Sequence, residues 1–222
     1  MQPKIKICGI TNTGDAELAA CCGADFIGIV CEISYSPRSI SRRAAAELAR
    51  RSRLPAILLL DKPVRQAVEI GRRIRPFGLQ LIAEYSFDDI ALLKRETGCS
   101  IWLPVRIPAH DSLQDAQSSG IQGYLDSINR SSCDTVILDT LVSGMKGGTG
   151  KTCDWGLAEK ISAASRAPVF LAGGITAENA AQACTVVRPS GIDVSSGVET
   201  SPGVKDPEKI EMLIREIRSL QL

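Results

Sequence analysis

Two residues that could carry acid–base chemistry end apolar, strand-like segments. Cys8 follows KIKI in segment 4–10, and Asp139 closes VILD in segment 134–140. A deprotonated thiol is a base, and a nearby ammonium lowers its pKa; alternation along a strand puts Lys6 on the same inward face. A carboxyl group in an apolar pocket has a raised pKa and can supply a proton. The pair predicts proton transfer, although an inert buried cysteine and a loop-capping aspartate would fit the same positions.

A phosphate site is predicted where two glycine-bearing loops follow the last two strand-like segments. The first loop contains Gly173 and Gly174, and the second contains Ser195, Ser196 and Gly197. Backbone N–H groups in such loops bind anions, often with the help of a short helix N-terminus. Tight turns that need positive φ would give the same glycines. Because both loops carry the feature, we expect them to bind one phosphate together.

Two other loops could complete the site. Ser36-Pro37-Arg38 follows the second strand-like segment, and the arginine offers a planar fork for a carboxylate or phosphate. A solvated loop arginine is the alternative. The run 147–152, GGTGKT, imitates a nucleotide-binding P-loop, but Met145 stands where that motif requires its first glycine. We therefore expect a substrate lid there rather than an NTPase.

The elements that must position these residues alternate along the chain. Strands are predicted over 4–10, 25–31, 54–61, 77–82, 100–107, 134–140, 168–174 and 191–196. Helices are predicted over 13–22, 41–52, 63–74, 86–96, 111–131, 154–164, 177–187 and 207–220. The helix starts are supported by N-cap candidates Ser41, Ser86, Asp154 and Thr176, and by Pro207 at a first helical position. Eight strand–helix units favour the α/β class and a single (β/α)8 barrel domain over 1–222, with the site at the carboxyl ends of the strands.

Composition excludes several classes of protein. The formal net charge is +1, which gives no electrostatic sign of a nucleic-acid or membrane partner. No apolar run is long enough for a transmembrane helix, and the start shows no signal peptide. Eight cysteines without a Cys-x-x-Cys pair, beside one histidine, argue against structural zinc. We expect free thiols in a reducing cytoplasm and a small-molecule ligand.

The motifs together resemble the phosphoribosylanthranilate isomerase family. The matching stretches are KICGIT, GADFIGIV, SPR, LD before GGTGKTCDW, PVFLAGGIT, GIDVSSGVE and PGVKD, in the family's order. The resemblance implies a (β/α)8 barrel without a metal or organic cofactor, which converts N-(5-phosphoribosyl)anthranilate to the 1-deoxyribulose 5-phosphate compound in tryptophan biosynthesis. It implies that Cys8 is the general base, Asp139 the general acid, and Arg38 the group that holds the anthranilate carboxylate. The two glycine loops would hold the phosphate.

The fourth strand-like segment departs from the family pattern LQLHG. This chain reads Leu79-Gln80-Leu81-Ile82-Ala83-Glu84, so isoleucine replaces a histidine of the lumen, and alternation puts Gln80, Ile82 and Glu84 on one face. We expect Lys6, Gln80 and Asp193 to contact the substrate, a phosphorylated sugar, in a monomer or homodimer. The departure leaves two alternatives open: an isomerase for another phosphoribosyl-amine, with a pocket altered near Ile82 and Arg106, and an inactive phosphosugar-binding relative.

Overall fold

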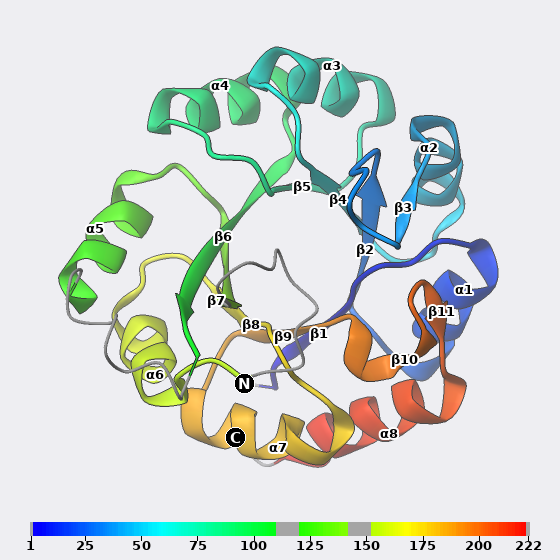
Figure 1. Cartoon of the computed structure of the whole chain (residues 1–222), viewed down its shortest axis with the longest axis vertical. Coiled ribbons are helices and arrows are strands. Elements are labelled where there is room, and N and C mark those ends of the chain that lie inside the picture. Colours follow the sequence, from blue (N-terminus) through cyan, green and yellow to red (C-terminus); the bar gives the residue numbers. More distant parts are fainter. Residues whose placement is uncertain (1, 110–119, 142–151, 221–222) are drawn as a thin grey trace.

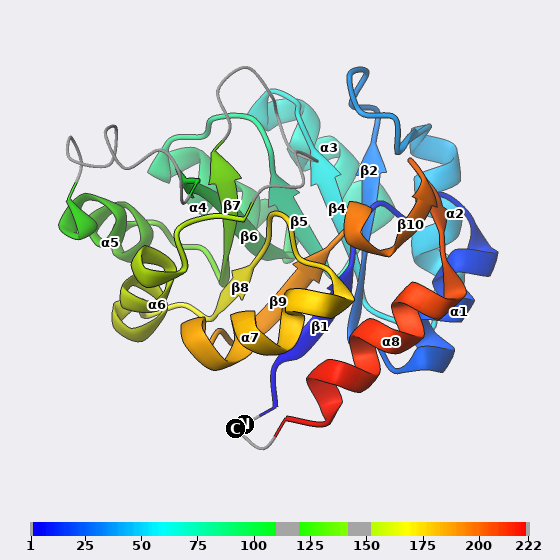
Figure 2. The ribbon, with the colours of Figure 1, turned by 60° about the horizontal axis from the view of Figure 1, so that its bottom comes forward.

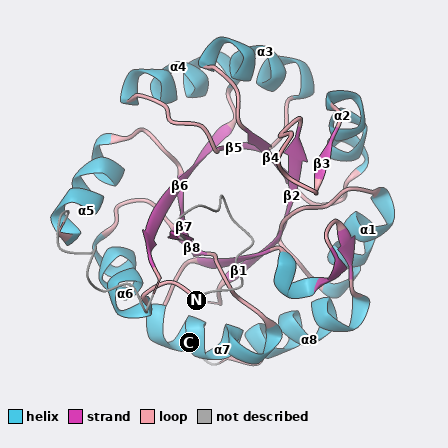
Figure 3. Cartoon of the chain, viewed as in Figure 1, coloured by secondary structure: helices cyan, strands magenta, loops and turns pink. Residues whose placement is uncertain are grey.

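The chain folds into a ring of parallel strands surrounded by helices, as a computed structural model shows (Figures 1 and 3). The structure describes residues 2–109, 120–141 and 152–220. The barrel strands are β1 (Lys4–Ile7), β2 (Phe26–Cys31), β4 (Ala56–Leu60), β5 (Gly78–Leu81), β6 (Ser100–Pro108), β7 (Thr135–Leu141), β8 (Val169–Leu171) and β9 (Gly191–Val194). The helices are α1 (Thr13–Cys22), α2 (Arg42–Arg51), α3 (Val64–Ile74), α4 (Phe87–Thr97), α5 (Ile121–Arg130), α6 (Trp155–Ala164), α7 (Ala177–Val187) and α8 (Pro207–Arg218).

The sheet closes on itself because β1 pairs with both β2 and β9. Every pairing between barrel strands is parallel, and the order β1-β9-β8-β7-β6-β5-β4-β2 follows the chain around the ring. The predicted (β/α)8 barrel is thereby confirmed. All eight strands consequently end at one pole of the barrel, which is where function is placed in this fold.

Local chemistry explains where the elements begin and end. The Ser41 side chain accepts a hydrogen bond from the Ala44 N–H at 3.2 Å, and Asp154 caps α6 in the same way. Several strands are shorter than predicted at their carboxyl ends, whereas β6 and β7 each extend one residue further than predicted. β1 stops at Ile7 because Gly9 has φ +77°, and β8 stops at Leu171 because the chain turns at Gly173 with φ +80°.

Four short elements were not predicted from the sequence. They are β3 (Ser39–Ile40), the 3-10 turn η1 (Ser196–Val198), and a hairpin of β10 (Glu199–Ser201) and β11 (Val204–Lys205). Figure 2 shows β10 on the side of the barrel toward which β2 and β7 point. The predicted helix over 111–131 is described only from residue 120, and α5 begins at Ile121. Within the described residues, no helix has the length and apolar character needed to cross a membrane.

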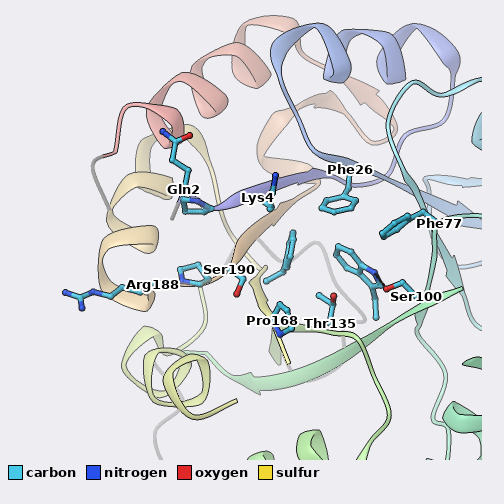
Figure 4. Close-up of a pocket in the computed structure, with 13 residues that line it drawn as sticks. Gln2, Lys4, Phe26, Phe77, Ser100, Thr135, Pro168, Arg188 and Ser190 are labelled. Carbon is cyan, nitrogen blue, oxygen red and sulfur yellow. Dashed lines mark hydrogen bonds between the residues drawn. The ribbon is translucent and has the colours of Figure 1, made fainter. Parts of the chain in front are cut away.

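The lumen is closed at the amino-terminal pole by aromatic rings. Trp102 and Phe170 lie 4.8 Å apart between ring centroids, and Phe26 packs edge-on against both. Below these rings lies a hollow of about 860 Å³, with Phe77 at its edge and Thr135 and Ser190 also lining it (Figure 4). None of the predicted site residues lines this hollow, because they all lie above the aromatic plug.

Candidate active site

A smaller cavity, of about 220 Å³, lies at the pole where the strands end. It is lined by nearly all the residues predicted from the sequence: Cys8, Arg38, Gln80, Asp139, Gly173, Gly174, Asp193, Ser195, Ser196 and Gly197. The remaining predicted residue, Lys6, does not line the cavity and is completely buried. Segments from both ends of the chain therefore meet in one cavity that could hold a small molecule.

Cys8 is fixed at the end of β1 by its neighbours on both sides. Its N–H donates to the Val194 carbonyl oxygen at 2.8 Å. Its Sγ lies against β2 where Gly28 leaves room, since a Cβ at that position would be 2.6 Å from the sulfur. Burial raises the pKa of the Cys8 thiol, whereas the cations Lys6 and Lys205 lower it. The expected effect of Lys6 is present, but burial outweighs it.

A buried ion pair forms the floor of the cavity. The Lys6 ammonium donates to Asp193 Oδ2 at 2.8 Å and to Gln80 Oε1 at 2.9 Å. Burial pulls the pKa of Lys6 down, but Asp193 and Cys8 together raise it above its ordinary value, so Lys6 stays charged. The other Asp193 oxygen, Oδ1, is buried and accepts no hydrogen bond from any described residue. Such an orphan acceptor is costly unless a ligand donates to it.

Asp139 faces the cavity from β7, on a strand neighbouring β6. Its Oδ1 accepts a hydrogen bond from the Thr140 N–H at 2.8 Å. Burial raises the pKa of Asp139, Asp193 adds to the rise, and Arg106 opposes it. Arg106 lies beside Asp139 in the β6–β7 register. A carboxyl group in this setting holds its proton at higher pH than an exposed aspartate does.

The two glycine loops touch one another and form an open cradle. A Cβ on Gly197 would lie 2.0 Å from the Ile175 carbonyl oxygen, and a Cβ on Gly173 would lie 2.1 Å from Thr140 Oγ1. Only glycine permits these approaches. Within the described chain, the N–H groups of Gly173 and Gly174 donate no hydrogen bond. These free donors, together with η1 and the start of α7, make a surface suited to an anion.

Arg38 reaches the cavity but is held by a partner that the sequence did not reveal. Its Nε and Nη2 donate to the Glu199 carboxylate at 2.8 and 2.6 Å. The second unforeseen residue is Lys205, whose ammonium donates to Glu199 Oε1 at 2.7 Å. Glu199 lies in the GVE stretch and Lys205 in the PGVKD stretch, so a charged residue near a glycine turn was the available signal. The pairing spans 161 residues between Arg38 and Glu199, which no local pattern indicates.

The segment at the end of β5, where the sequence differs from the family pattern LQLHG, is only partly as predicted. Ile82 lines the cavity and packs with the cluster of Cys8, Val30 and Leu59. Glu84 is exposed and does not line it, because β5 ends at Leu81 and strand alternation no longer applies. The prediction that Glu84 shares the lumen face was therefore wrong.

The predicted lid over 147–152 lies outside the described residues, apart from Thr152. Among the residues that the structure describes, no three His, Cys, Asp or Glu side chains gather as metal ligands would. All eight cysteines are free thiols.

Comparison with known proteins places the chain in a family. The family model described as N-(5'-phosphoribosyl)anthranilate isomerase matches residues 5–216. A relative of that name from Pelobacter propionicus is 37% identical over 96% of this chain and 94% of its own length. The phosphoribosyl anthranilate isomerase structure from Thermococcus kodakaraensis is 30% identical with a TM-score of 0.83, covering 98% of this chain and all of its own. A further structure, in complex with reduced 1-(o-carboxyphenylamino)-1-deoxyribulose 5-phosphate, has 26% identity and a TM-score of 0.78, with coverage of 98% and 100%. The chain belongs to the N-(5'-phosphoribosyl)anthranilate isomerase family.

Proposed function

We infer that this protein isomerises N-(5'-phosphoribosyl)anthranilate to 1-(2-carboxyphenylamino)-1-deoxyribulose 5-phosphate, an Amadori rearrangement in tryptophan biosynthesis. The observation that carries this inference is the single cavity shared by Cys8, Asp139 and the glycine cradle, in a chain of this family. A thiol, a carboxyl group and an anion site are the parts that the reaction needs.

The first step opens the furanose ring, and we assign it to Asp139. Protonating the ring oxygen allows the C1′–O bond to break and leaves an iminium at C1′. Burial favours the protonated carboxyl group of Asp139, so a proton is available in the cavity. The Thr140 N–H holds one oxygen, which orients the other toward the lumen.

The second step removes the C2′ proton, and we assign it to Cys8. The iminium makes this proton acidic, and its loss gives an enolamine that tautomerises to the ketone. The Lys6 ammonium lies below the Cys8 thiol and favours the deprotonated form of the thiol. The Asp193 carboxylate holds this ammonium in place by a hydrogen bond. Asp193 Oδ1 is free to accept a hydrogen bond from a sugar hydroxyl, which would satisfy the orphan oxygen.

The two ends of the substrate are assigned to the two anion-binding features of the cavity. The cradle of Gly173, Gly174 and Ser195–Gly197 takes the phosphate through backbone donors. Arg38 takes the anthranilate carboxylate with its Nη1 edge, since Nε and Nη2 are occupied by Glu199.

Ile82 supports a second candidate, an isomerase for a different phosphoribosyl-amine. The side chain offers no hydrogen bond where the family pattern has a histidine. We favour phosphoribosylanthranilate, because neither the acid nor the base lies on β5. We also propose that the protein works in a reducing compartment as a monomer or homodimer; its eight free thiols support the first part.

The direct test follows the loss of anthranilate-type fluorescence when phosphoribosylanthranilate is added to the purified protein, with the product identified by mass spectrometry. We expect turnover in the presence of a chelator. An intact barrel that leaves this substrate unchanged but isomerises another phosphoribosyl-amine would establish the second candidate instead.

A further inference from the structure

A lysine outside the substrate cavity is bonded to two of its functional segments at once. Lys205, at the end of the β10–β11 hairpin, has a completely buried side chain. Its ammonium donates to the Cys8 carbonyl oxygen at 2.6 Å, to the Ser195 carbonyl oxygen at 3.2 Å and to Glu199 Oε1 at 2.7 Å. All three N–H groups are thereby used. Lys205 therefore has no donor left for a substrate and can act only through its partners.

The partner Glu199 carries the connection on to Arg38. Its carboxylate is almost fully buried and accepts from the Arg38 guanidinium, from Lys205 and, at 3.3 Å, from the Gly203 N–H. Arg38 crosses directly over Gly9, where a Cβ would lie 2.5 Å from the arginine Cδ. The arginine thus has a fixed path, and its Nη1 edge is the one without a partner among the described residues.

The charges of this cluster do not cancel. Arg38 and Lys205 are two cations against the one carboxylate of Glu199, which leaves one positive charge beside the cavity. The charged groups facing Cys8 are Lys6 on β1, Asp193 on β9, Lys205 on β11 and Arg38 in the loop after β2. Lys6 and Asp193 neutralise each other as a pair, so the excess positive charge comes from the Arg38–Glu199–Lys205 cluster.

We propose that Lys205 is a positioning residue, which ties the Cys8 backbone to the phosphate loop and, through Glu199, aims Arg38 while keeping the cluster positive. This inference rests on the proposed function for the roles of Cys8 and Arg38. Lys205 would have two distinct effects. Its hydrogen bonds fix the distances between Cys8, the phosphate loop and the Nη1 edge of Arg38. The net positive charge of the cluster favours the Cys8 thiolate and the anionic groups of the substrate.

The alternative is a tether that only stabilises the hairpin, and the pH dependence of Cys8 alkylation separates the two. Iodoacetamide modification of Cys8 is followed by peptide fragmentation over a range of pH, in the full-length protein without substrate. Lys205→Met removes the cation with little change in side-chain length. Since a neighbouring opposite charge shifts a pKa by about one unit or more, alkylation at pH 7 should slow roughly tenfold.

Glu199→Gln gives the opposite charge change and keeps the test informative if Lys205→Met folds poorly. It raises the cluster from one positive charge to two, so Cys8 alkylation should be at least as fast as in the unaltered protein. Lys209→Met is the matched control. The Lys209 ammonium donates to the Glu199 backbone oxygen at 2.7 Å and is half exposed, so alkylation should not change.

The kinetic result completes the test. We expect Lys205→Met to raise KM and lower kcat, and Glu199→Gln chiefly to raise KM, because Arg38 loses its anchor. Slowed alkylation in both Lys205→Met and Glu199→Gln would mean general loosening and would overturn the proposal, as would unchanged alkylation in Lys205→Met. If the unaltered protein does not isomerise phosphoribosylanthranilate, the proposed function fails, but the alkylation result still decides the charge effect of Lys205.

Discussion

Separating Lys6 from Asp193 should cost far more stability than removing both. The pair is buried, with the Lys6 side chain wholly inaccessible and Asp193 nearly so. Lys6→Met leaves a buried carboxylate without its cation, and Asp193→Asn leaves a buried ammonium without its anion. Breaking such a pair from one side costs about 3–5 kcal/mol, whereas replacing both partners is often nearly neutral.

The magnitude follows from a double-mutant cycle in urea at pH 7, measured by far-ultraviolet circular dichroism. Independent effects would make the double variant roughly 6–10 kcal/mol less stable, the sum of two single losses. We expect it to be no less stable than either single variant, a coupling of about 3 kcal/mol or more. Additive losses would refute the reasoning.

Three further predictions concern the cavity. Gly197→Ala places a Cβ 2.0 Å from the Ile175 carbonyl oxygen, which disturbs the phosphate cradle, so KM should rise at least ~10-fold (~1.4 kcal/mol). Gly120→Ala is the control, because nothing lies within 4 Å of its Cβ, and KM should not change. Burial raises the pKa of both Cys8 and Asp139, so both limbs of the pH profile of kcat/KM should lie at higher pH than an exposed cysteine and aspartate would give. Catalysis needs the Cys8 thiolate and the protonated Asp139 carboxyl group together, so activity should fall at both extremes of pH; full activity at pH 4 would contradict this. Ile82→His should change kcat/KM only a few-fold, and a large gain would show that the altered strand limits catalysis.

Much of the barrel could be predicted because its determinants are local. Helix α1 and helix α7 have the predicted limits, because the polar caps and left-handed turns at their ends depend on residues that are adjacent in the sequence. Strand ends were predicted too long where glycine turns follow an apolar run, as at Gly9 and Gly173. Alternation beyond the true end of β5 also misplaced Glu84.

The candidate site was predictable to the extent that it sits at strand ends. Cys8 and Asp139 follow from that rule and from the family motifs, and the cavity brings them together. The Arg38–Glu199–Lys205 cluster could not be predicted, because Arg38 is far from Glu199 in the sequence and the two meet only when the barrel closes. The balance between burial and nearby charge at Cys8 likewise depends on packing, which only the folded chain provides.

The most direct test of the central claim is turnover of phosphoribosylanthranilate by Cys8→Ala and Asp139→Asn, each checked for unchanged circular dichroism and urea midpoint. Both variants remove a positioned proton-transfer group and leave the phosphate cradle intact. We predict a loss of at least ~10²-fold in kcat for each. Near-normal turnover in either correctly folded variant would contradict the assignment of Cys8 as base and Asp139 as acid.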